Sequence, residues 1–252
     1  MNKEERELQF RDYINTCMTP HNIEFIGLGN PYAKILLVGQ ESAMKTKEGE
    51  ENKVIGEVNN RFIKEYNNRN YLYLYYQPRF YQDRVDKHGK RILNHTWNAY
   101  QKLIDFIRPE NKRSTGIEEN TDFCMDAFTT EMNNTISPHR APNWKPRIET
   151  FKHSDYIKGF PVVILACSHY IHNIDGDRQI DETFDVTYDT KDGAHLYPGG
   201  MRFYTHHSSD RRRLVIHTRQ LSMYSFELLH GMAEVIIKHL QEIGESYEAI
   251  SY

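Results

Sequence analysis

Side chains that could catalyse a reaction follow several apolar stretches of this 252-residue sequence. Gln40 and Glu41 follow one stretch, Asp126 lies in a second, and His217 ends a third. A carboxylate can orient or deprotonate water, and an imidazole can donate or accept a proton. These residues form a candidate site if the fold brings them together, but on their own they do not define a reaction.

The elements that would position these residues alternate between strands and helices. A continuous apolar run predicts a buried strand at 34–38, and we expect further strands at 122–130, 161–167 and 213–217. Apolar residues spaced three and four apart predict helices at 4–17, 94–107, 147–158 and 222–243. This alternation indicates a three-layer α/β/α fold with a central four-stranded, mainly parallel sheet.

Ligands of such open sheets bind outside the carboxyl ends of the strands. We expect 39–41, 126–128, 167–169 and 217–219 to follow those ends, so that two carboxylates and two histidines would meet at one edge.

The remaining regions are less distinct in the sequence. Residues 43–90 are polar and then tyrosine-rich, and no element is assigned to them. The Gly/Asp-rich stretch 173–210 predicts a hairpin insertion, with short strands at 183–188 and 201–205. At this length we expect a single domain over residues 1–252.

Several of these segments resemble motifs of the uracil-DNA glycosylase superfamily. Gly39-Gln40-Glu41-Ser42 is similar to the water-activating motif Gly-Gln-Asp-Pro-Tyr-His, and His217-Thr218-Arg219-Gln220-Leu221-Ser222 is similar to His-Pro-Ser-Pro-Leu-Ser. Between them, residues 123–130 resemble the base-reading strand Leu-Leu-Leu-Asn-Ala-Val-Leu-Thr, and residues 97–103 resemble the helix before it. The motifs come in the family's order, so the resemblance implies a uracil-DNA-glycosylase-like fold.

The resemblance implies a flipped base and hydrolysis of its N-glycosidic bond, as in base excision repair. Glu41 would orient the water, and His217 would donate to the departing base oxygen. Gln40 would contact the base through its backbone, Asp126 would read the base edge, and Phe80 would stack on the ring. Because an ionised Asp can only accept hydrogen bonds where the family's Asn also donates, we expect a base other than uracil.

The same resemblance implies contacts with DNA. Ser222 would hold a phosphate, Leu221 would be the intercalating wedge, and Arg219 with the nearby arginines 211–213 would form a local basic patch. A local patch is required because the net charge is -3 and the pI is about 6.5. The arginines could equally be a solvated strand end.

Composition restricts the other possibilities. The three cysteines are far apart and show no zinc or iron-sulfur spacing, which favours buried reduced thiols. No apolar run is long enough to span a membrane, and the amino terminus is charged. We therefore expect a cytoplasmic monomer without a cofactor.

Three readings compete with an active glycosylase. Glu41 and Asp126 could cap helices or turns, and His217 could be a hydrogen-bonded core residue. The fold could also be a catalytically inactive nucleobase-binding or interaction protein. A metal-dependent hydrolase is the third, prompted by His169, His172, His206-His207 and Asp175-Gly176-Asp177, although no recognised metal signature is present.

Overall fold

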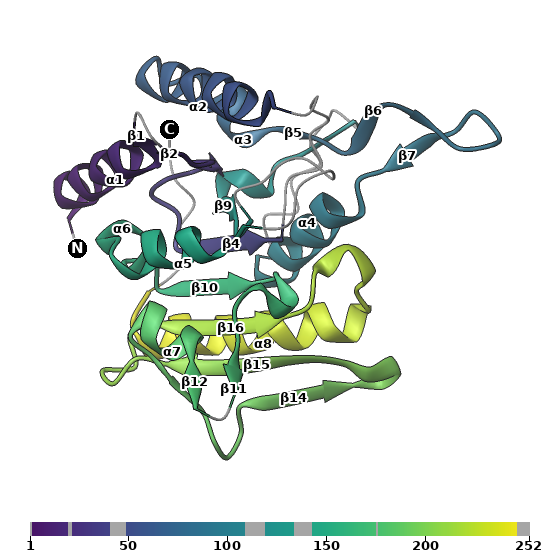
Figure 1. Ribbon diagram of the computed structural model, residues 1–252. Coiled ribbons are helices and arrows are strands. Elements are labelled where there is room, and N and C mark those ends of the chain that lie inside the picture. The colour runs from purple at the N-terminus through teal and green to yellow at the C-terminus, as the bar shows by residue number, and fades with distance from the viewer. Residues whose placement is uncertain are drawn as a thin grey trace.

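The computed structural model describes residues 2–19, 22–40, 49–108, 119–133, 143–174 and 176–245 (Figure 1). These residues form a mixed α/β fold around an eight-stranded sheet with the order β13-β15-β16-β10-β4-β9-β3, in which β14 also pairs with β15. The strands of this sheet are β3 (Leu28–Gly29), β4 (Ile35–Gly39), β9 (Ala127–Glu131), β10 (Val162–Leu165), β13 (Thr187–Tyr188), β14 (Ala194–Tyr197), β15 (Met201–His207) and β16 (Leu214–Thr218).

Helices and short two-stranded pairs surround the sheet. The α-helices are α1 (Lys3–Cys17), α2 (Glu51–Asn67), α3 (Tyr71–Tyr75), α4 (His95–Ile107), α5 (Lys145–Lys152), α6 (Asp155–Lys158), α7 (Gln179–Phe184) and α8 (Phe226–Glu242). The 3-10 helices are η2 (Phe123–Met125), η3 (Ser168–Tyr170), η4 (Pro198–Gly200) and η5 (Leu221–Met223). The short paired strands are β1 (Met18–Thr19), β2 (Asn22–Ile23), β5 (Gln77–Pro78), β6 (Phe80–Val85), β7 (Arg91–Leu93), β8 (Asn120–Thr121), β11 (Asn173–Ile174) and β12 (Asp177–Arg178).

The centre of the sheet is parallel, as predicted. Strands β16, β10, β4 and β9 pair in parallel, whereas β15 and β3 join the two sides in the antiparallel direction. All residues of β4 and β10 are buried. Their uninterrupted apolar sequences therefore reflect strands that are covered on both faces.

Helices lie on both faces of this sheet. On one face, side chains of α1, α2, α5 and α6 pack against Leu36, Val163 and Val215. On the other face, α4 and α8 pack against Leu37 and Ile164. Alternate residues of the same strands thus enter opposite cores, and the layers are helix, sheet and helix.

A buried arginine ties the first layer to the sheet. Arg147 of α5 is fully buried and pairs with Glu24 at 2.7 Å. Its guanidinium also donates to the hydroxyls of Tyr13 and Thr130, each at 2.7 Å. Because every partner offers an acceptor, the charge is buried with its hydrogen-bonding capacity used.

Several predicted elements are observed with different boundaries. The first half of the strand predicted at 122–130 is the 3-10 helix η2, and the predicted helix at 147–158 is split into α5 and α6. The strand predicted at 183–188 is wrong for its first part, where the end of α7 lies. The unassigned stretch 43–90 contains α2, α3 and part of the β6–β7 hairpin, which projects from the body of the fold in Figure 1.

Two further expectations can be compared with the structure. All three cysteines are buried, as predicted. Among the described residues, no helix is long and apolar enough to cross a membrane.

Candidate functional site

The sheet has one position where its connections diverge. In chain order its parallel strands are β4, β9, β10 and β16, but in space β4 lies between β9 and β10. This order, second-first-third-fourth, places a topological switch point between β4 and β10. The carboxyl ends of β4 and β10, at Gly39 and Leu165, therefore border the position where open α/β sheets bind ligands.

Gln40 and a buried asparagine lie at this edge. The backbone N–H of Asn133, just beyond β9, donates to the carbonyl of Gln40 at 2.8 Å. The side-chain oxygen of Asn133 accepts from the N–H of Asn143, also at 2.8 Å. Glu41, the residue predicted to orient water, lies outside the described residues. The sequence does not single out Asn133, because Asp126 occupies the position that matches the family's asparagine.

A carboxylate from β9 also reaches this edge. Glu131 pairs in register with Gly39, and a Cβ atom on Gly39 would collide with the Glu131 carboxylate. Burial raises the pKa of Cys167 and of Tyr100, and the negative charge of Glu131 is the second cause in both cases. The Glu131 carboxylate therefore lies beside the ends of β4 and β10. In the sequence, Glu131 could have been found as the acidic residue that follows Thr129 and Thr130 at the end of a predicted strand.

His217 lies at the same edge, at the end of β16. Its Nε2 is 2.8 Å from the backbone carbonyl oxygen of Ser168, which can only accept a hydrogen bond. Nε2 therefore carries the ring hydrogen. Burial lowers the pKa of His217 to about 4, opposed by the Ser168 carbonyl and reinforced by His206 and His172.

The protonation state of His217 decides what the ring can do. The imidazole is neutral at pH 7, so Nδ1 has no hydrogen and can only accept. The predicted donation to a departing base would require the ring to leave the Ser168 carbonyl. Ser168 itself has a positive φ of 53°, an uncommon conformation for a residue other than glycine.

Asp126 is not at this edge, and the prediction that it follows the carboxyl end of its strand is wrong. It precedes β9, whose first residue, Ala127, pairs with Ile35 at the start of β4. His217 is level with Thr130 of β9. It therefore lies four residues beyond Asp126 along the strand direction, about 13 Å, and on the third strand away from β9. The buried Asp126 carboxylate instead forms an ion pair with Arg108. The two side chains therefore cannot contact the same base.

The intercalating role predicted for Leu221 is also wrong. Leu221 is 0% exposed and packs in the core between α4 and α8. Two residues later, Met223 is 61% exposed. The motif predicts a surface position for Leu221, whereas its side chain is part of the core that α4 and α8 form with the sheet.

The predicted basic patch is divided between the two edges. Arg219 is exposed just after β16, at the carboxyl edge. Arginines 211–213 precede β16 and so lie at its other end, where Arg213 donates to the carbonyl of Phe184. Only Arg219 of this predicted patch is therefore near His217.

The remaining predicted residues have no described contact with His217 or Gln40. Phe80 begins the β6–β7 hairpin, where the guanidinium of Arg91 lies 5.0 Å from its ring. Ser222 lies within η5, before the amino terminus of α8.

The histidines that prompted a metal site are bound to separate carboxylates. His172 contacts Asp177 at 3.2 Å, His206 contacts Asp181 at 2.8 Å, and His207 contacts Asp189 at 2.7 Å. His169 is exposed in η3, and Asp175 lies outside the described residues. Within the described ranges, no three His, Cys, Asp or Glu side chains could hold one metal ion.

Comparisons of the chain with models of known protein families, with curated proteins and with solved structures find no match.

Proposed function

We propose that this chain is a DNA glycosylase-like protein that binds a flipped nucleobase of DNA at the carboxyl edge of β4, β10 and β16 and hydrolyses its N-glycosidic bond. One observation carries this proposal. The two loops that resemble glycosylase motifs follow β4 and β16, which are separated only by β10, and both strands end at the same edge. Two strand spacings are about 10 Å, which a base and its sugar can span.

Within this proposal, Glu41 orients the attacking water and Gln40 contacts the base through its backbone. Asn133 replaces Asp126 as the residue that reads the base, because it is buried beside Gln40 and its amide can both donate and accept. His217 accepts a hydrogen bond through Nδ1 instead of donating one. Gln40, Asn133 and His217 all lie at the carboxyl edge.

The DNA-binding part of the proposal also changes. Arg219 and Ser222 remain the candidates for phosphate contacts, and Met223 replaces Leu221 as the apolar side chain that enters the gap left by the flipped base. Exposure supports this exchange, because a core residue such as Leu221 cannot enter DNA without unfolding its loop.

The identity of the base is open within this proposal. Asp126, whose carboxylate would disfavour uracil, lies away from the carboxyl edge. Uracil therefore belongs in the test together with damaged and alkylated bases.

The proposal is tested with DNA oligonucleotides that carry single modified bases, scored for alkali-labile abasic sites. We expect the wild-type protein to release at least one base and Glu41→Gln to reduce the rate by about 100-fold or more, within the range of general acid–base catalysis. Glu131→Gln tests the second carboxylate, and Glu57→Gln is the control because Glu57 is exposed on α2. Wild-type protein that releases no base from any substrate would exclude the enzyme.

A second candidate is a nucleobase-binding protein without catalytic activity. It is favoured by His217, whose only ring hydrogen is already donated to Ser168. This candidate predicts that DNA with a modified base binds without release of that base. Glu41→Gln should then leave the affinity for this DNA unchanged within about twofold.

A further inference from the structure

The β6–β7 hairpin projects from the body of the fold and carries an excess of positive charge (Figure 1). Its strands pair from Phe80 and Leu93 to Val85 and Arg91, with a bulge in β6 between these pairs. Residues 79–91 contain five Lys or Arg and two Asp, whereas the whole chain contains 32 Lys or Arg and 35 Asp or Glu. A local excess of this kind attracts a nucleic acid to a protein whose net charge is negative.

The turn of the hairpin is held in a defined shape by its own hydrogen bonds. The Asp86 carboxylate accepts from the backbone N–H groups of His88 and Lys90, at 2.8 and 2.9 Å. The backbone N–H of Asp86 donates to the carbonyl of Lys90 at 2.8 Å, and Gly89 adopts a positive φ of 75°. These bonds order the turn, so that the exposed side chains of Lys87 and Lys90 extend from a fixed end of the hairpin.

Two arginines of the hairpin lie against aromatic rings. The guanidinium of Arg84 is 4.7 Å from the ring of Tyr81. The guanidinium of Arg91 is 5.0 Å from the ring of Phe80 and also pairs with Glu119 at 2.7 Å. Both partners of this ion pair are exposed, and exposed ion pairs contribute little to stability. A phosphate can therefore replace Glu119 while the rings keep both guanidinium groups in place.

The hairpin lies at the same edge of the sheet as the candidate base site. It leads directly into α4, whose far end, Arg108, pairs with Asp126 at the amino end of β9. Nearer to the hairpin, Lys102 of α4 donates to the hydroxyl of Tyr224, just beyond β16, at 2.6 Å. The helix therefore begins at the carboxyl edge. Figure 1 agrees, because the hairpin extends on the side toward which the arrows of β4, β10 and β16 point.

The dimensions of the hairpin match the major groove of B-form DNA. That groove is about 12 Å wide and about 8.5 Å deep, and it admits a two-stranded β-ribbon. At about 3.3 Å per residue, the chain from Lys90 to Asn94 spans about 13 Å. The turn can therefore reach into the groove while the body of the fold stays outside.

We propose that the β6–β7 hairpin enters the major groove of duplex DNA and contacts its phosphates through Arg84, Lys87, Lys90 and Arg91. This inference rests on the proposed function for the identity of the partner, and it adds that the substrate is duplex DNA and that the protein holds it outside the base site. Because phosphate contacts carry no sequence information, the hairpin binds DNA whether or not a modified base is present.

The test is the affinity of the full-length protein for an unmodified DNA duplex, measured by fluorescence anisotropy at several salt concentrations. We expect Lys87→Ala/Lys90→Ala to weaken binding at least tenfold. The slope of log K against log salt should fall by about two, because two phosphate contacts are lost. Lys87→Arg/Lys90→Arg keeps the charge and should bind within about twofold of wild type.

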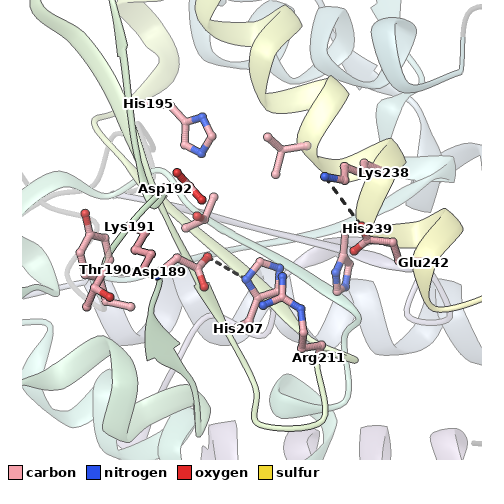
Figure 2. Close-up of a pocket in the computed structure, with 13 residues that line it drawn as sticks. Asp189, Thr190, Lys191, Asp192, His195, His207, Arg211, Lys238, His239 and Glu242 are labelled. Carbon is pink, nitrogen blue, oxygen red and sulfur yellow. Dashed lines mark hydrogen bonds and ion pairs between the residues drawn. The ribbon is translucent and has the colours of Figure 1, made fainter.

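Lys191→Ala/Lys238→Ala is the matched control. It removes the same charge from two exposed lysines that line a cleft between the turn after β13 and α8 (Figure 2). His207 lines the same cleft and pairs with Leu214, the first residue of β16, so this cleft is at the amino end of the sheet, away from the hairpin. The control should change DNA affinity less than twofold.

Two further ligands test the fit to the groove. Duplex RNA of the same sequence should bind at least fivefold more weakly, because side chains cannot enter its deep and narrow major groove. Single-stranded DNA of the same length, which has no groove, should also bind at least fivefold more weakly. The proposal is overturned if wild type does not bind duplex DNA, if Lys87→Ala/Lys90→Ala binds it as the control does, or if either of these ligands binds as tightly as duplex DNA.

These measurements are separate from base release. If the hairpin binds duplex DNA but wild type releases no base, the hairpin stands and the glycosylase activity is excluded. If wild type releases a base and Lys87→Ala/Lys90→Ala keeps full affinity, the glycosylase activity stands and the hairpin contact is excluded.

Discussion

The two ends of the parallel sheet differ in how they hold their polar side chains. At the amino end, Asp126 is neutralised by the side chain of Arg108. At the carboxyl end, the side chain of Asn133 accepts from the backbone N–H of Asn143, and the ring of His217 donates to the backbone carbonyl of Ser168. Polar residues next to apolar runs thus differ in role. The buried ion pair of Asp126 stabilises the fold, whereas the ring of His217, bound through Nε2 alone, can still bind a ligand through Nδ1.

This comparison predicts that substitutions at the amino end change stability and that substitutions at the carboxyl end change binding. Asp126→Ala should have the largest effect, lowering the free energy of unfolding by about 3–5 kcal/mol because it removes the carboxylate that forms a buried ion pair with Arg108. Urea denaturation measures the loss. The double variant Arg108→Met/Asp126→Leu should recover much of it, and a stable Asp126→Asn protein that loses only nucleobase binding would reverse our assignment.

Substitutions of Leu221 and Met223, two residues apart in η5, should affect different properties: the first should lower stability and the second should weaken DNA binding. Leu221→Ala removes a fully buried side chain and should cost about 2–5 kcal/mol, whereas Met223→Ala should cost less than about 0.5 kcal/mol. Thermal unfolding gives the first comparison and DNA affinity the second. If Met223→Ala binds DNA as tightly as wild type, the wedge proposed here is incorrect.

The neutral state of His217 should make stability depend on pH. Its folded pKa of about 4 lies below the ordinary value of 6.5, so the unfolded chain takes up a proton first as the pH falls. Stability is therefore lost from about pH 6.5 to pH 4, by about 3 kcal/mol for this residue, and the loss stops below the folded pKa. The free energy of unfolding is measured against pH for wild type and for His217→Gln, and the difference between the two curves gives the contribution of His217. Identical curves would contradict this prediction.

Gly39 should be sensitive for a local reason. In Gly39→Ala, the new Cβ would displace the Glu131 carboxylate, at a cost of about 1 kcal/mol because the end of this side chain can move aside. Gly56 is the control because it lies in α2 with only ordinary contact to Ile23 at 3.7 Å, so Gly56→Ala should stabilise the protein by about 0.5–1 kcal/mol. The double variant Gly39→Ala/Glu131→Ala should lose less than Gly39→Ala if the carboxylate is the cause, as guanidinium denaturation would show.

The central strands could be predicted because burial on both faces requires continuous apolar sequence. The runs around Leu36, Val163 and Val215 are strands in the structure. The helix predicted at 94–107 is α4 (His95–Ile107), with Asn94 as its N-cap. Helix α2 was not recognised because part of its buried surface is polar. Asn59 accepts from the N–H of Ile26 and donates to the carbonyl of Glu24, so an asparagine occupies a position where periodicity requires an apolar residue.

The ends of the strands were harder to predict than the strands themselves. Phe123 and Cys124 are buried like strand residues but form a 3-10 turn, which moved the predicted start of β9 and placed Asp126 at the wrong end. Burial follows apolar composition, whereas the position of a strand end depends on backbone pairing with a neighbour far away in sequence. The candidate site was predicted only in part for this reason, since Gln40 and His217 lie at the carboxyl edge but Asn133 and Glu131 were missed.

The buried Arg147 also has a consequence for how the chain assembles. Its partners Glu24 and Tyr13 precede it by 123 and 134 residues. During synthesis the first helix and β2 can form early, but the Glu24 carboxylate has no guanidinium partner until α5 has emerged from the ribosome. Such distant contacts slow folding, so the amino-terminal layer should dock late, after much of the sheet has been made.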